Sequence, residues 1–201
     1  EGDADTVDGK GGANTLELST GVHTLTTNSK LLNIQTIKTN SSGSQLDLTN
    51  QSEDFTIEVG AGTDNVKGGS GADTIKVNSA GQGNADTLDG GAGTSDILQL
   101  SAGSHSFTDN SKLVNVETIK GHASSATTVV LTGQLETLKV DGGSAGDIIT
   151  GGNGDDIITG GGGDDIITGG AGDDSLTGNA DNDTFKVDGG TDTITDLATG
   201  D

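Results

Sequence analysis

The sequence predicts an all-β protein built from short stacked repeats. Its most regular stretch, residues 142–195, is written in blocks of nine, each with a glycine-rich first part and an apolar last part. The rest of the chain offers short alternating segments rich in β-branched residues, with few helix signals. Self-similarity at a short fixed period is typical of units that stack on their neighbours. We therefore expect a solenoid of short strands and tight turns.

Within the regular stretch, the blocks follow the pattern Gly-Gly-x-Gly-x-Asp-x-U-x, where U is a large apolar residue. The blocks GGNGDDIIT and GGGGDDIIT match it in full, GGSAGDIIT and GGAGDDSLT match it nearly, and two worn copies, GNADNDTFK and VDGGTDTIT, close the run. The sixth position holds Asp147, Asp156, Asp165, Asp174, Asp183 and Asp192, and the eighth holds Ile149, Ile158, Ile167, Leu176, Phe185 and Ile194. Side chains alternate along a strand, so we expect the eighth position to face inward and the seventh outward.

The residue types of one block suit a metal-binding turn. Glycine adopts positive φ easily and lets backbone carbonyls approach an ion closely. Aspartate is short enough to reach an ion from the turn, and Ca²⁺ takes six to eight oxygen ligands from carboxylates and carbonyls. An isolated Asp-Gly pair usually marks a solvated turn, whereas serial spacing of nine residues favours ligation.

These blocks resemble the calcium-binding nonapeptide repeats of the RTX (haemolysin-type) family. The resemblance implies a parallel β-roll in which two blocks form one coil and several calcium ions lie between stacked turns. In such a roll the position-six carboxylates would bind calcium, and turn carbonyls would complete each site. The carbonyl ligands we expect are those of Gly151, Asn153, Gly160, Gly162, Gly169 and Ala171. We expect the aspartates at position five (Asp155, Asp164 and Asp173) to be solvated.

Composition and charge point to a fold that depends on metal. Only 28% of the residues are hydrophobic and 1% are aromatic, while the net charge is −22. Without cations, stacked carboxylates repel and a thin core does not offset chain entropy. Bound calcium would turn that repulsion into ligation, so that binding free energy becomes folding free energy. The acidic surface argues against nucleic acid as a partner, and no apolar run is long enough for membrane insertion.

The N-terminal part carries further copies of the block. The opening residues place Asp5 at position six, and the next block has Asn14 there, whose single neutral oxygen predicts a weak or absent ion. Glu1 stands where an initiator Met would be, which suggests a fragment of a longer protein. Between the first blocks and the next ones, residues 15–59 read as strands, from Thr15, Val22, Asn33, Gln45 and Phe55. They indicate either wider solenoid coils or a β-sandwich-like insertion.

The repeat returns at residue 60 and places Asp64 and Asp73 at position six. Asp86 and Asp96 follow one extra turn residue. We expect this residue to displace their carboxylates and to make them less secure calcium ligands than the others.

An internal duplication links two strand-rich segments. TLELSTGVHTLTTNSKLLNIQTIK from Thr15 aligns with ILQLSAGSHSFTDNSKLVNVETIK from Ile97, and pairs His23 with His105. We therefore expect a first strand-rich unit with repeats over 1–84, its duplicate over 85–141, and the main roll over 142–201. Matching places in a duplicated unit favour a structural role for these histidines and for His122, and no catalytic motif is present.

The isoleucines at position seven are a candidate contact surface. If position eight faces inward, Ile148 and Ile166 face outward from one sheet and Ile157 from the other. Exposed apolar ladders of this kind mark contacts in other proteins. We therefore expect possible partners to be copies of the chain or neighbouring modules.

The function expected from these features is that of a non-enzymatic, calcium-binding structural module of an exported bacterial surface protein, of the S-layer or adhesin type. The family resemblance implies type I secretion, and folding outside the cell on extracellular calcium. An alternative is an auxiliary repeat domain of a secreted toxin or hydrolase. Ice binding is a weaker alternative, because regular Thr ranks are absent from the turns.

Overall fold

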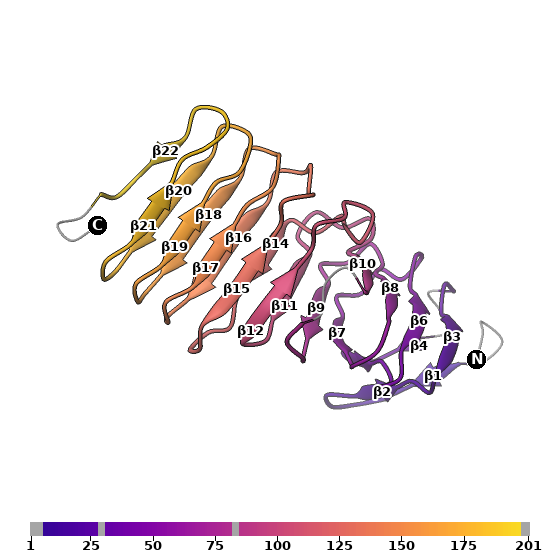
Figure 1. Cartoon of the computed structure of the whole chain (residues 1–201). Helices are drawn as coiled ribbons and strands as arrows, with labels where there is room; N and C mark the ends of the chain where they lie inside the picture. The colour runs from indigo at the N-terminus through magenta and orange to yellow at the C-terminus, as the bar shows by residue number, and fades with distance from the viewer. Residues whose placement is uncertain (1–5, 28–30, 82–84, 198–201) are drawn as a thin grey trace. The chain divides into compact units, whose positions relative to one another are not determined.

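The protein is described by a computed structural model that covers residues 6–27, 31–81 and 85–197. All regular elements in these ranges are β-strands, and the strands pair in parallel (Figure 1). No helix in the described part of the chain is long and apolar enough to span a membrane. The sequence-based expectation of an all-β parallel solenoid is confirmed.

The chain forms two compact units, and the division between them falls within β11 (Ile97–Leu100). The first unit comprises residues 1–79, 85–98 and 111–116, and the second comprises 80–84, 99–110 and 117–201. The three-part division expected from the sequence remains a prediction.

The first unit stacks its strands into two parallel sheets. One sheet orders β2 (Thr15–Glu17), β5 (Thr36–Lys38), β7 (Thr56–Val59) and β9 (Thr74–Val77). The other orders β13 (Leu113–Val114), β10 (Thr87–Asp89), β8 (Asn65–Lys67), β6 (Ser44–Asp47) and β3 (Gly21–Thr24). A short pair, β1 (Val7–Asp8) with β4 (Leu31–Leu32), completes the unit.

The strand-rich segment therefore forms coils of the solenoid, which decides between the two alternatives left open by the sequence. Each strand of the segment pairs with the equivalent strand of the next coil, as Ile37 does with Ile57 and Ile57 with Ile75. The five expected strands are all present. The short strand β4 was not expected, because two leucines beside a polar turn give no alternation to detect.

The second unit is the more regular one. Its first sheet orders β14 (Thr118–Lys120), β16 (Lys139–Gly143), β18 (Ile157–Gly161), β20 (Ser175–Asn179) and β22 (Thr193–Ile194). Its second orders β12 (Gly103–Ser106), β15 (Thr127–Val130), β17 (Ile148–Thr150), β19 (Ile166–Thr168) and β21 (Thr184–Lys186). Register partners such as Ile148 and Ile166 are two blocks apart, so two nonapeptides make one coil.

The core of the second unit is a column of position-eight side chains. Ile149, Ile158, Ile167 and Leu176 are each 0% exposed, as the alternation predicts. At the C-terminal end of the column, Phe185 and Ile194 are only half-buried. Among the position-seven residues, Ile148 is 44% and Ile157 is 49% exposed, while Ile166 is intermediate. Ile148 and Ile166 share one sheet and Ile157 lies in the other, as expected.

Candidate metal centre

The aspartates at position six are buried, although each carries a carboxylate. Eight of them expose at most 2% of their surface, and Asp183 exposes 5%. The eight are Asp64, Asp73, Asp86, Asp96, Asp147, Asp156, Asp165 and Asp174. Asp192 is half-buried, and Asp5 lies outside the described residues. Buried ionised carboxylates are unfavourable unless donors or cations compensate them.

One oxygen of each carboxylate is compensated by the backbone of the preceding coil. In the second unit the Oδ1 atom of Asp156 accepts the N–H of Leu138 at 2.8 Å, and that of Asp165 accepts the N–H of Asp147 at 2.6 Å. The same bond, 18 residues back along the chain, reaches Asp174, Asp183 and Asp192. In the first unit the interval varies, at 18, 22 and 23 residues for Asp73, Asp86 and Asp96. Position six therefore fastens each coil to the one before it.

The second oxygen of each carboxylate, Oδ2, is the candidate metal ligand. The Oδ2 atoms of Asp86, Asp147, Asp165 and Asp174 are buried and accept no hydrogen bond within the described residues. Those of Asp73 and Asp156 each accept one N–H, from a glycine of their own turn. An unpartnered buried carboxylate oxygen is costly, and a cation is the partner that would remove the cost.

Backbone carbonyls of the next coil lie beside these Oδ2 atoms. A Cβ added to Gly142 would stand 2.3 Å from the carbonyl oxygen of Gly160 and 2.7 Å from Oδ2 of Asp147. At Gly151 the corresponding distances are 2.0 Å to the Gly169 carbonyl and 2.9 Å to Oδ2 of Asp156. Only glycine leaves this space open, so position one is fixed by the need for close approach of two oxygens.

This arrangement fits calcium. Two of the expected carbonyl ligands, those of Gly160 and Gly169, converge with a carboxylate oxygen, and oxygens of both kinds are ligands that calcium prefers. No group of three or more His, Cys, Asp or Glu side chains that could hold a metal occurs within the described ranges. A site here would consist of carbonyls with few carboxylates.

The position-three residues play a second part in the turns. The N–H groups of Asn153, Gly162 and Ala171 donate to the position-two carbonyl of the preceding coil, at 2.7, 3.1 and 3.0 Å. These bonds fix the turns in register. Ligation by the carbonyls of the same three residues remains a prediction.

Burial changes the acidity of the position-six carboxyls. Burial, together with the neighbouring charges of Asp183 and Asp147, raises the pKa of Asp165 from 3.8 to about 6, against a hydrogen bond from the backbone that lowers it. Burial also raises the pKa of Asp64, Asp73, Asp86, Asp147, Asp156 and Asp174. The metal-free roll therefore holds its carboxylates in an environment that disfavours their charge.

The position-five aspartates do more than the sequence suggested. They are exposed, as expected, but each also binds the next coil. Oδ1 of Asp155 accepts the N–H of Asp173 at 2.8 Å, and Oδ1 of Asp164 accepts the N–H of Asn182 at 2.9 Å. In an Asp-Asp pair, the first carboxylate thus accepts a backbone N–H of the next coil, and the second accepts one of the preceding coil. The nine-residue recurrence of position five was the signal that could have revealed this role.

The expected displacement of Asp86 and Asp96 is wrong. Both are 0% exposed, and their Oδ1 atoms accept the N–H groups of Asp64 and Asp73 at 2.8 and 2.7 Å. The longer coils of the first unit accommodate the extra turn residue. Both carboxylates therefore stand where the others do.

The duplicated histidines are buried and make the same backbone contact in each copy, and their structural role stays a prediction. His23 is 7% and His105 is 1% exposed. Their Nε2 atoms lie 2.9 and 3.0 Å from the carbonyl oxygens of Ser19 and Ser101, the same contact in each copy.

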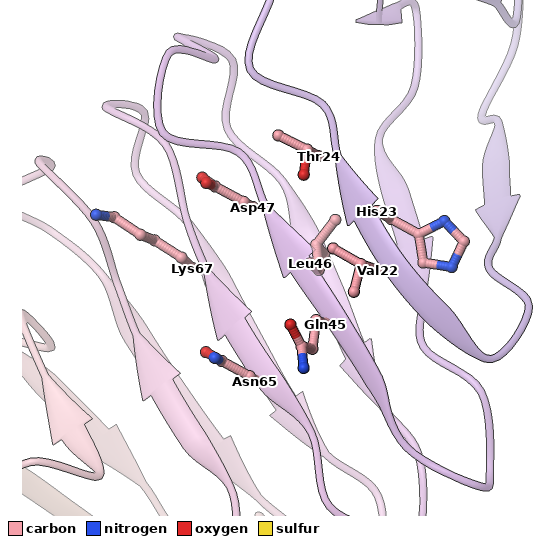
Figure 2. Close-up of a pocket in the computed structure, with 8 residues that line it drawn as sticks. All are labelled: Val22, His23, Thr24, Gln45, Leu46, Asp47, Asn65 and Lys67. Carbon is pink, nitrogen blue, oxygen red and sulfur yellow. The ribbon is translucent and has the colours of Figure 1, made fainter. Parts of the chain in front are cut away.

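A shallow pocket lies on the outer face of β3, β6 and β8 (Figure 2). Val22, Gln45 and Asn65 form one row across it, and Thr24, Asp47 and Lys67 form a second. The buried His23 ring points away from these rows in Figure 2. Lys67 lies 3.9 Å from Asp89, in a loose ion pair.

Comparison with known proteins agrees with the geometry of the turns. The model of the RTX calcium-binding nonapeptide repeat matches four segments, residues 1–21, 56–79, 141–176 and 162–194. The position-six aspartates from Asp64 to Asp73 and from Asp147 to Asp192 lie within them. No curated protein and no solved structure matches the chain.

Proposed function

Since this chain belongs to the family of RTX calcium-binding nonapeptide repeats, whose domains each bind several calcium ions, we propose that it is a structural module of an exported bacterial surface protein. In this role it binds calcium through its stacked turns and catalyses no reaction. Calcium outside the cell would fold it into a rigid segment of an S-layer or an adhesin.

The observation that carries the proposal is the state of the position-six carboxylates. They are buried with one oxygen bound to the preceding coil, and in Asp147, Asp165 and Asp174 the other oxygen has no hydrogen-bond donor in the described chain. A carbonyl of the next coil lies beside Oδ2 of Asp147. Metal binding at such positions is coupled to folding, because the unfolded chain has no preformed site.

The same coupling supports export followed by folding. A chain with a net charge of −22 and 28% hydrophobic residues lacks the apolar surface that normally drives collapse. Where calcium is scarce the chain would stay open, as secretion through a type I system requires. Where calcium is near millimolar, the range in which extracellular calcium modules bind (about 10⁻⁴ to 10⁻³ M), it would fold. Ile148 and Ile157 offer apolar contacts to neighbouring molecules from the two sheets.

Far-UV circular dichroism during a calcium titration tests the proposal, with magnesium as the control. We expect a cooperative transition from coil to β-structure with calcium, reversed by a chelator. Magnesium should produce no such transition, because it demands near-octahedral geometry and dehydrates reluctantly. A β-spectrum that persists in chelator would refute calcium-coupled folding.

A further inference from the structure

The first repeat turn of the described residues, that of Asn14, departs from the Asp147 turn at one atom. Its position-six residue is Asn14, and its position-one residue is Gly9. A Cβ added to Gly9 would stand 2.6 Å from Nδ2 of Asn14 and 2.6 Å from the carbonyl oxygen of Asn33 in the next coil. In the turn of Gly142 the same point is flanked by Oδ2 of Asp147 and the carbonyl oxygen of Gly160. The two turns have the same plan, with nitrogen in place of oxygen.

The nitrogen changes what the turn needs. In the Asp147 turn the two converging atoms are both acceptors, and one carries charge, so a cation is required to hold them together. In the Asn14 turn the amide donates directly to the Asn33 carbonyl, with Nδ2 and oxygen 2.8 Å apart. A second bond, of 3.2 Å, joins Nδ2 to the carbonyl of Gly12. The turn is closed by its own side chain.

Two glutamines make a related bond, to the preceding coil, in coils that have an apolar residue at position six. Phe55 and Leu138 occupy that position, since their N–H groups donate to Asp73 and Asp156 one coil later. In these coils Gln51 and Gln134 stand at position two, and both are 0% exposed.

The amides of these glutamines also meet position-one carbonyls. Nε2 of Gln134 donates to the carbonyl of Phe107 at 2.8 Å, and Nε2 of Gln51 donates to that of Leu25. Phe107, like Leu131 and Gly151, donates its N–H to the residue that ends the strand of the next coil, which places it at position one. Nε2 of Gln134 makes a second bond, of 3.3 Å, to the carbonyl of Asp109. The Oε1 atoms of both glutamines are buried without a donor in the described chain, so the bonds of Nε2 set the orientation of each amide.

We infer that the side-chain amide of Asn14 takes the place of a bound calcium ion in the first repeat turn, and that this turn is a latent calcium site opened by the single change Asn14→Asp. The inference rests on the proposed function, since it assumes that the carboxylate turns bind calcium. Gln51 and Gln134 donate in a similar way, but to a carbonyl of the preceding coil.

Calcium counting by equilibrium dialysis of the whole chain tests the inference. We expect Asn14→Asp to bind one more ion than the wild type, because the carboxylate and the Asn33 carbonyl then form the pair seen at Asp147. Asn65→Asp is the matched control, because Asn65 is exposed and lies on strand β8, outside the repeat turns. It adds the same charge and should bind no additional ion.

A third variant, Asn14→Ala, removes the amide and should leave the wild-type count unchanged. An equal count in Asn14→Asp and wild type would overturn the inference, as would loss of an ion in Asn14→Ala. A wild-type chain that binds no calcium would refute the proposed function as well, so the two failures are distinguishable.

Discussion

At the scale of single residues, the Asp-Asp pair makes the side-chain contacts that join one repeat coil to its neighbours. In the turn of Asp164 and Asp165, the first carboxylate binds the N–H of Asn182 in the coil ahead, and the second binds that of Asp147 in the coil behind. Only the second is buried and keeps an oxygen without a donor. Removal of the charge of Asp165 should therefore affect stability and calcium binding more than removal of the charge of Asp164.

Substitution of Asp165 by Asn should change stability in opposite directions with and without calcium. With calcium about 100-fold above its Kd, loss of one ion should lower the free energy of unfolding by about 2.7 kcal/mol. In chelator, Asn removes a buried charge, so less trimethylamine oxide should be needed to fold the chain.

Asp164→Asn is the control, because Asn keeps an acceptor for the Asn182 N–H on an exposed side chain. Its unfolding free energy should stay within about 0.5 kcal/mol of the wild type in both conditions. Urea denaturation in calcium measures the first effect. A destabilised Asp165→Asn chain in chelator would contradict the assignment of a buried charge.

At the scale of the turn, Gly160 and Gly162 are separated by one residue and have different structural roles. A Cβ on Gly160 would stand 2.1 Å from Oδ2 of Asp165, the buried carboxylate oxygen without a donor. A Cβ on Gly162 would meet nothing nearer than 3.6 Å, the Cα of Ser144. The repeat pattern requires glycine at position one and allows any residue at position three, and the structure gives the reason for this difference.

Gly160→Ala should therefore destabilise the calcium-bound chain by about 1–3 kcal/mol, the usual consequence of forcing extra volume into a packed site. It should also lower the number of bound calcium ions by one. Gly162→Ala should leave both quantities near the wild-type values, because its side chain has room. Thermal unfolding in calcium, together with calcium counting, compares the two. Equal effects of the two changes would show that position one has no special role.

At the scale of the whole molecule, protonation and calcium binding are two ways to neutralise the same buried carboxylates. Burial raises the pKa of Asp165 to about 6, against 3.8 for the unfolded group, and the pKa values of Asp64, Asp73, Asp86, Asp147, Asp156 and Asp174 move in the same direction. The folded chain then binds protons more tightly than the unfolded chain. Stability without calcium should rise as the pH falls from about 6 towards 4.

In chelator, we therefore expect the far-UV spectrum to gain β-structure on acidification through this window. Calcium should bind more weakly at pH 5 than at pH 7, since protons compete for the same carboxylates. Sedimentation at low protein concentration is needed as a control, because the sequence pI of about 4.1 favours association near the lower limit. A metal-free spectrum that does not change between pH 7 and pH 4 would contradict the raised pKa values.

The parts of the fold that follow from periodicity could be predicted from the sequence. Ile158 faces the core and Ile157 the outside because strand alternation leaves no other choice. The forward contact of Asp155 and the amide of Gln134 were missed, since each joins residues in different coils. Such contacts depend on which coil lies above which, and the irregular coil lengths of the first unit hide that register.

The 18-residue coil of the second unit also has a mechanical consequence. A coil adds only about 5 Å to the length of a parallel stack, while the same 18 residues reach about 60 Å when extended. A pull along the stack would detach the unit coil by coil, because each coil is held by its contacts with the neighbouring coils. The unit would then lengthen in equal steps of roughly 55 Å, one coil and its ions at a time. Under load the roll would therefore extend in steps. The length of each step is set by the repeat, and the force needed for it is set by calcium binding.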